Sequence, residues 1–377
     1  MKRVVKQIMD KIKRFIDCYI PTETCNLRCH YCYIAQKRKF NNKILKLKRT
    51  YSDIKKAFSQ ERLGGVCLIN LCAGGETLLS RDVLPIAKAL IEEGHYVMIV
   101  SNGTISDRFK EISQWDERLK SHLFIKFSFH YLELVRLNIL DRYFSNIKLM
   151  KENNVSLTVE LTPSDELIGY IDEIKEVCLT ELDTLCHVTI ARDDRTDGIN
   201  HLSKYDFQKY KEIWSTFDSK MFEFKSNIFY QKRNEFCYAG DWSLYINIDS
   251  GTIRQCYCGK LLGNIYNYDE PIKFEAVGAR CILPHCYNGH SFLTLGDIPE
   301  ITGTSYADVR NRKCSDGTEW LTPNVKYIMQ SRLSESNKQY SFYRKFRINH
   351  QADSFREFMS TFKFYQKLHD IKIKNKH

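Results

Sequence analysis

Residues 15–33, FIDCYIPTETCNLRCHYCY, begin with a short apolar run and end in three closely spaced cysteines. The run FIDCYI (15–20) has the length and composition of a buried β-strand. Cys25, Cys29 and Cys32 follow it with the spacing C-x3-C-x2-C. A disulfide would use two of these thiols and leave one over, whereas a metal centre can bind all three. The stretch therefore predicts a strand that leads directly into a metal-binding loop.

Five further apolar runs repeat this strand pattern along the first part of the chain. They cover residues 66–73, 96–101, 123–129, 156–162 and 186–191, and helix-length segments such as 81–95 and 132–154 lie between them. Such β-α alternation predicts a parallel sheet covered by helices. Six β-α units fit a partial barrel better than a closed barrel of eight strands. We then expect the functional site at the carboxyl ends of the strands.

The pattern changes after about residue 220. SLYINIDSGTIRQCYC (243–258) alternates as a β-hairpin does and turns at Asp249-Ser250-Gly251. Cysteines gather again here, at Cys237, Cys256, Cys258, Cys281 and Cys286. We therefore expect an α/β core over residues 1–220, a small α+β domain over residues 221–321 and a helical tail over residues 322–377.

Composition limits the class of protein. The chain has 377 residues and 14 cysteines, and it contains neither a long apolar run nor a secretory signal at its start. We therefore expect a cytoplasmic protein without a membrane span, whose cysteines hold metal instead of forming disulfides. The net charge of +11 comes from Lys and Arg spread along the chain, which favours a solvated basic surface over a nucleic-acid site.

Thiolate is a soft ligand that suits zinc or iron–sulfur clusters. Structural zinc needs four ligands, and His30 inside the loop is the available fourth. A 4Fe–4S cluster normally takes four cysteines, so three would leave one iron open to a substrate or cofactor. The residues alone leave both readings open.

The spacing C-x3-C-x2-C, with Tyr31 before its last cysteine, resembles the signature of the radical S-adenosylmethionine superfamily. The resemblance implies that Cys25, Cys29 and Cys32 hold a 4Fe–4S cluster. Its open iron would chelate the amino and carboxylate groups of S-adenosylmethionine.

Further strand ends are similar to motifs of that superfamily. Gly74-Gly75-Glu76 after the second strand resembles its GGE motif, which binds the methionine amino group. The resemblance also implies cofactor contacts from Tyr31 in the cysteine loop. At the ends of later strands it implies contacts from Ser101, Asn102, Ser128 and Arg192. Val159 or Leu161 on the fifth strand would meet the adenine.

The second group of cysteines has its own resemblance. Cys237-x13-Gly251-x4-Cys256 and GNIY (263–266) are similar to the start of SPASM and twitch domains. The resemblance implies one auxiliary 4Fe–4S cluster held by Cys237, Cys256, Cys281 and Cys286. The last pair departs from the family pattern, because it is spaced C-x4-C where C-x2-C is usual. Cys258, His285 and a structural zinc in the same cysteines therefore remain alternatives.

The resemblance implies an enzyme that cleaves S-adenosylmethionine reductively to a 5′-deoxyadenosyl radical, which abstracts a substrate hydrogen. It also implies a reductant such as flavodoxin or ferredoxin and a peptide or small polar substrate. Only 17 residues precede Cys18, which counts against leader-guided peptide modification. Loops 288–300 and 306–321 are candidates to line a substrate pocket, through Tyr306, Arg310, Arg312, Asp316 and Trp320. The alternative is a non-catalytic iron–sulfur or zinc protein, or a basic module that binds nucleic acid. No catalytic residue is assigned.

Overall fold

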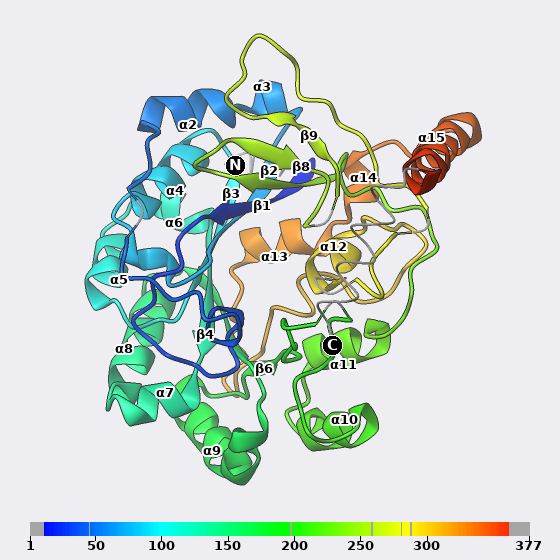
Figure 1. The fold of residues 1–377 in the computed structure, drawn as a ribbon. Coiled ribbons are helices and arrows are strands. Elements are labelled where there is room, and N and C mark those ends of the chain that lie inside the picture. The colour runs from blue at the N-terminus through cyan, green and yellow to red at the C-terminus, as the bar shows by residue number, and fades with distance from the viewer. Residues whose placement is uncertain are drawn as a thin grey trace, which may run out of the picture.

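The computed structural model describes residues 11–44, 46–196, 198–257, 259–279, 281–286 and 289–361. Six strands, in chain order, form its parallel core (Figure 1). They are β1 (Arg14–Ile20), β2 (Cys67–Ala73), β3 (Tyr96–Ser101), β4 (Leu123–Phe129), β5 (Ser156–Leu161) and β6 (His187–Val188). Each strand pairs in parallel with the next. The expected parallel α/β core, in the form of a partial barrel, is confirmed.

The sixth strand is shorter than its apolar run predicts. Regular pairing covers His187 and Val188, whereas the run extends over residues 186–191. Thr189 still donates its backbone N–H to Leu161 at 3.0 Å, but that of Ala191 turns to the Tyr210 hydroxyl at 3.1 Å. At this edge of the sheet, a hydrogen bond to the Tyr210 side chain thus replaces the backbone hydrogen bond that would continue the strand pairing.

Helices cover the outer face of the sheet, along the left-hand side of Figure 1. They are α2 (Tyr51–Ala57), α3 (Gln60–Leu63), α4 (Val83–Glu92), α5 (Ser106–Ser113), α6 (Glu117–Ser121), α7 (Tyr131–Arg136), α8 (Leu140–Glu152) and α9 (Ile171–Leu182). The short 3₁₀ helices η1 (Thr77–Leu79) and η2 (Asp165–Tyr170) follow β2 and β5. The segment expected as one helix over residues 132–154 is two, because Asn138 adopts a left-handed φ of 53° between α7 and α8.

The predicted hairpin is present, and it extends the same sheet. β7 (Ser243–Asn247) and β8 (Thr252–Arg254) pair in antiparallel fashion around Gly251, whose φ is 76°. β7 also pairs in parallel with the free side of β1, and β9 (Leu261–Asn264) completes the sheet beyond β8. The predicted boundary at residues 220/221 falls at the start of a helix, and the division into domains stays a prediction.

The other helices are α1 (Tyr33–Gln36), α10 (Phe207–Ser215), α11 (Lys220–Ile228), α12 (Gly289–Leu295), α13 (Pro323–Gln330), α14 (Leu333–Ser336) and α15 (Phe342–Thr361). Except for α1, they lie on the other side of the strands from α2–α9 in Figure 1. Tyr306, Phe292 and Ile328, from this second half, join Phe15 and Phe124 of the sheet in one apolar cluster. Part of the chain after β9 therefore packs against the inner face of the sheet.

The inner face changes from apolar to polar along the strands. Phe124 of β4 is in that apolar cluster, and Lys126, two residues later on the same face, pairs with Glu160 of β5 at 2.9 Å. Asp17 of β1 likewise accepts a hydrogen bond from Asn70 of β2 at 2.8 Å. The carboxyl halves of the strands thus present polar groups to the interior.

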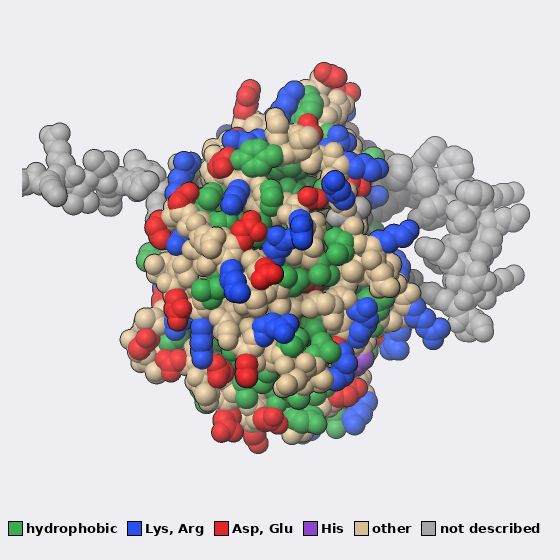
Figure 2. All heavy atoms as spheres, turned by 90° about the vertical axis from the view of Figure 1, so that its left-hand side faces the viewer, with side chains coloured by type: hydrophobic (Ala, Val, Ile, Leu, Met, Phe, Trp, Pro, Cys, Tyr) green, Lys and Arg blue, Asp and Glu red, His purple; other side chains and the backbone are tan. Residues whose placement is uncertain are grey.

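The helical surface carries charges of both signs. Figure 2 shows Lys and Arg side chains interspersed with Asp and Glu on this face, without a basic patch. None of the described helices combines the length and apolar character that crossing a membrane would require.

Candidate active site at the carboxyl ends of the strands

The first site is a pocket at the carboxyl ends of β1 to β4. Residues from every predicted motif in this region line it: Cys25, Cys29, Cys32, Gly74, Gly75, Glu76, Ser101, Asn102 and Ser128. They meet because the carboxyl ends of adjacent parallel strands lie at one edge of a sheet. Their roles toward a cofactor remain predictions.

The three thiols of the loop offer three sulfur donors to one pocket. Burial raises the pKa of Cys25 to about 11, and it also raises the pKa of Cys29 and of Cys32. Neutral thiols are therefore the stable form until a metal displaces their protons. Three sulfur donors within one loop suit an iron–sulfur cluster that leaves one iron open.

The glycines after β2 allow two backbone segments to approach. The N–H of Gly75 donates to the Thr22 carbonyl at 2.6 Å, and that of Glu76 donates to the Thr24 carbonyl at 2.9 Å. A Cβ on Gly75 would lie 1.9 Å from the Thr24 oxygen. These glycines therefore hold the start of the cysteine loop against the end of β2.

Glu76 joins the ends of β2 and β3. Its side chain is buried, and its carboxylate accepts hydrogen bonds from the Leu78 N–H at 2.9 Å, the Ser101 hydroxyl at 2.8 Å and the Asn102 N–H at 2.7 Å. Burial raises the pKa of Glu76, whereas the hydrogen bonds from these three donors lower it. A carboxylate has about four acceptor positions, so one remains for an ammonium group.

Asn102 connects the end of β3 to the cysteine loop. Its amide Nδ2 donates to Asn26 Oδ1 at 2.8 Å and lies 3.8 Å from Cys25 Sγ. Asn26 in turn donates to the Thr104 hydroxyl at 2.7 Å. This chain of hydrogen bonds fixes the loop between its first two cysteines.

Two predicted cofactor residues lie outside the lining of this pocket. The Tyr31 hydroxyl lies 2.7 Å from Nδ1 of His130, a pocket residue that the sequence analysis missed although it follows Ser128 by two positions. Burial lowers the pKa of His130 to about 4, so its ring is neutral. Arg192 is partly buried beyond β6, where its carbonyl accepts a hydrogen bond from Gln36.

The adenine contact expected from β5 is wrong. Val159 and Leu161 both belong to the apolar core between the sheet and its outer helices. Side chains alternate along a strand, so these two face away from the interior while Glu160 faces it. The apolar character that suggested a ligand contact reflects packing against helices.

A second pocket brings together the other four predicted ligands. Cys237, Cys256, Cys281 and Cys286 line it, among apolar neighbours that include Phe292 and Leu293. Burial raises the pKa of Cys237. Four cysteines around one apolar pocket suit a 4Fe–4S cluster. Cys258 lies outside the described residues.

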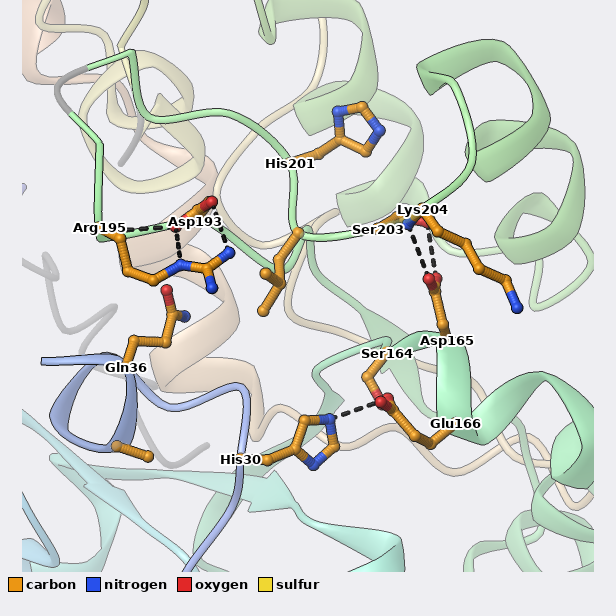
Figure 3. Close-up of a pocket in the computed structure, with 12 residues that line it drawn as sticks. His30, Gln36, Ser164, Asp165, Glu166, Asp193, Arg195, His201, Ser203 and Lys204 are labelled. Atoms are coloured by element: carbon orange, nitrogen blue, oxygen red, sulfur yellow. Dashed lines mark hydrogen bonds and ion pairs between the residues drawn. The ribbon is translucent and has the colours of Figure 1, made fainter. Parts of the chain in front are cut away.

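A third hollow, of about 660 Å³, opens beside the cysteine loop (Figure 3). His30 of that loop pairs with Glu166 at 2.8 Å, and Arg195 pairs with Asp193 at 2.8 Å. Sequence reasoning missed this hollow because its lining comes from four segments that lie far apart in the sequence. They fall within residues 30–36, 164–166, 193–195 and 201–204.

The loop residues proposed to line a substrate pocket have different surroundings. Arg310 and Tyr306 are buried, and Trp320 packs in the apolar core between the sheet and its outer helices. Arg312 donates to the Phe217 carbonyl at 3.0 Å, whereas Asp316 is exposed and accepts from Thr318. Of the five, Arg310 alone reaches the polar interior, where it pairs with Glu160.

Comparison with known proteins gives one family match. Residues 19–163 match the model described as the radical SAM superfamily. The 7-carboxy-7-deazaguanine synthase of Thermoplasma acidophilum is 33% identical over 90 residues, which are 24% of this chain and 39% of that protein. A GTP 3′,8-cyclase of Clostridium perfringens is 29% identical over 159 residues, 40% of this chain and 47% of that protein. The chain thus spans less than half the length of these curated relatives.

Similar solved structures include the histidine-tagged form of anSMEcpe with bound S-adenosylmethionine. It is 15% identical, with a TM-score of 0.49, and the match covers 90% of this chain and 96% of that one. Streptococcus suis SuiB bound to its precursor peptide SuiA is 16% identical, with a TM-score of 0.46 over 69% of this chain and 63% of that one.

Proposed function

We propose that the chain is an enzyme of the radical S-adenosylmethionine superfamily, whose model residues 19–163 match. A reduced 4Fe–4S cluster would give S-adenosylmethionine one electron, releasing methionine and a 5′-deoxyadenosyl radical that takes a hydrogen atom from the substrate. The observation that carries the proposal is the pocket shared by the three thiols and the ends of β2, β3 and β4.

The residues of this chain have distinct roles in the proposal. Cys25, Cys29 and Cys32 hold the cluster, and Glu76 offers its remaining acceptor position to the methionine amino group. Asn102 and Ser128 supply short polar groups at neighbouring strand ends. The protein thereby orients the cofactor and keeps water from the reacting atoms, while the cofactor supplies the difficult chemistry.

The second pocket supports an auxiliary 4Fe–4S cluster bound by Cys237, Cys256, Cys281 and Cys286. Full ligation by four cysteines would give that cluster a role in electron transfer or structure. The substrate class stays a peptide or a small polar molecule, and flavodoxin or ferredoxin is the proposed reductant. Thiols in this number favour a reducing compartment such as the cytoplasm.

Release of 5′-deoxyadenosine from the reconstituted, dithionite-reduced protein tests the proposal. We expect release by the wild type and none by the C25A/C29A/C32A variant. Cys178→Ala is the matched control, because that thiol lies in the apolar core between the sheet and its outer helices and not in the pocket. Absence of release from wild-type protein with a full cluster would favour a non-catalytic iron–sulfur protein, and bound zinc in place of iron would favour a structural site.

A further inference from the structure

A group of buried cations lies on the inner face of the sheet. Lys126 of β4 and Arg310 share a single carboxylate, that of Glu160, at 2.9 Å and 2.7 Å. The side chain of Arg310 is 1% exposed and that of Glu160 is 6% exposed. Two cations thus already balance this one buried anion.

A third cation, Lys225 of α11, adds positive charge to this group. Its ammonium donates to the Thr189 hydroxyl at 2.6 Å, just beyond β6, and the residue is 7% exposed. No carboxylate oxygen of the described chain forms an ion pair with it, in contrast to Lys126. Burial lowers the pKa of Lys225 to about 7; attraction by Glu160 raises this pKa, and repulsion by Arg192, Lys126 and Arg310 lowers it further. Such a charge is costly to keep unless an anion joins it.

Buried histidine nitrogens without partners lie in the same surroundings. His290 is 6% exposed, and its Nε2 lies 2.7 Å from Arg310, but its Nδ1 has no hydrogen-bond partner among the described residues. Neither ring nitrogen of His285, which is 1% exposed, has one. Buried polar atoms are nearly always hydrogen-bonded, so unpaired ones indicate a missing ligand or water.

The position of this group relates it to both cysteine sites. Lys126 lies two residues before Ser128, which lines the first pocket. His285 directly precedes Cys286, which lines the second. The group of cations and histidines thus adjoins, along the chain, one lining residue of each cysteine site.

We propose that Lys225, supported by Lys126 and Arg310, binds an anionic group of the substrate, a carboxylate or a phosphate. This inference rests on the proposed function, because it assigns the substrate to the same interior. It narrows the substrate class from peptide or small polar molecule to one that carries a carboxylate or a phosphate. The methionine carboxylate of S-adenosylmethionine is the other anion that Lys225 could bind. The test distinguishes this carboxylate from an anionic group of the substrate.

The test measures binding of inorganic phosphate and of acetate to the reconstituted full-length protein by anaerobic calorimetry. We expect wild-type protein to bind at least one of these anions and Lys225→Met to bind it at least about tenfold more weakly, the loss typical of one charge-assisted hydrogen bond. Lys220→Met is the control, because Lys220 begins the same helix with its side chain 66% exposed. Lys225→Gln should repeat the loss if the Met variant folds poorly.

Equal anion binding by the wild type and both Lys225 variants, or no binding by the wild type, would overturn the inference. A second measurement identifies the source of the anion. Without added anion, Lys225→Met should bind S-adenosylmethionine as tightly as the wild type does, as measured by equilibrium dialysis. Weaker cofactor binding would assign Lys225 to the methionine carboxylate and overturn the substrate assignment. Failure of the wild type to release 5′-deoxyadenosine would reject the proposed function. The calorimetry would still show whether Lys225 binds an anion.

Discussion

At the scale of single residues, Gly75 shows how closely the cysteine loop approaches β2. A methyl group at this position would overlap the Thr24 carbonyl, whose oxygen lies 1.9 Å from the ideal Cβ. Backbone cannot move aside as a flexible side chain can, so Gly75→Ala should displace the loop. We expect destabilisation of about 1–3 kcal/mol and a loss of iron from the first site, measured by chemical denaturation and iron analysis.

Gly169→Ala is the matched control for that change. A Cβ at Gly169, in η2, meets nothing within 4 Å. It should retain both iron and stability. Full iron content in Gly75→Ala would mean that the loop adapts without loss.

Glu76 is the residue through which the ends of β2 and β3 and the proposed cofactor meet. In the wild type, both carboxylate oxygens of Glu76 accept hydrogen bonds from N–H or O–H groups. In Glu76→Gln an amide NH2 group, which cannot accept hydrogen bonds, replaces one of these oxygens. We expect both clusters to remain and S-adenosylmethionine to bind roughly ten- to a hundredfold more weakly, measured by equilibrium dialysis. Glu117→Gln, with its side chain 75% exposed, is the control. Unchanged affinity would limit Glu76 to joining the two strands.

Lys225 predicts a pH dependence of stability. Its pKa is about 7 in the folded chain against 10.5 for the free group. Between these values the unfolded chain binds more protons at this site, so the site makes stability rise with pH. Lys225→Met should therefore be more stable than the wild type near pH 7, and the difference should shrink by roughly 1.4 kcal/mol per pH unit. Urea unfolding from pH 7 to 9 measures it, with Lys220→Met as control. A difference that stays constant would contradict the lowered pKa.

At the scale of elements, the β7–β8 hairpin and the loop that follows it bring together distant cysteines. Gly251 turns the chain with a φ of 76°, and Cys237 pairs its backbone with Gly278, a few residues before Cys281. Cys286 lines the resulting pocket with the other three predicted ligands. The unusual C-x4-C spacing is therefore compatible with one four-cysteine site.

This arrangement predicts different results at two neighbouring cysteines. Cys286→Ser should remove or alter the absorption and paramagnetic spectrum of the auxiliary cluster, because a hydroxyl is a poorer ligand for iron than a thiolate. Cys258→Ser should leave that spectrum unchanged. The opposite pair of results would make Cys258 the fourth ligand. A spectral change on adding substrate to the wild type would instead indicate an iron open to substrate.

At the scale of the whole molecule, the two pockets predict the total iron content. Two 4Fe–4S clusters contain eight irons, so we expect seven or eight per chain after anaerobic reconstitution. C25A/C29A/C32A and Cys237→Ala should each retain about four, measured by iron and sulfide analysis. A wild-type value near four would exclude the auxiliary cluster.

The sequence by itself determined the six-strand parallel core and the motifs of the first site. Both depend on local patterns: apolar runs define the strands, and the motif residues follow each strand directly. Once the strands lie parallel in chain order, their ends must meet, so Cys25, Gly75, Asn102 and Ser128 share a pocket without further information.

The tertiary structure alone decided which distant groups enter the interior. β7 pairs with β1 although more than 220 residues separate them, and Arg310 reaches Glu160 from a loop 150 residues later. Local periodicity carries no signal for such contacts, because their free energy comes from burial and pairing in the folded chain. The cationic interior around Lys225 could therefore be seen only after α11 and the residues after α12 had packed onto the inner face of the sheet.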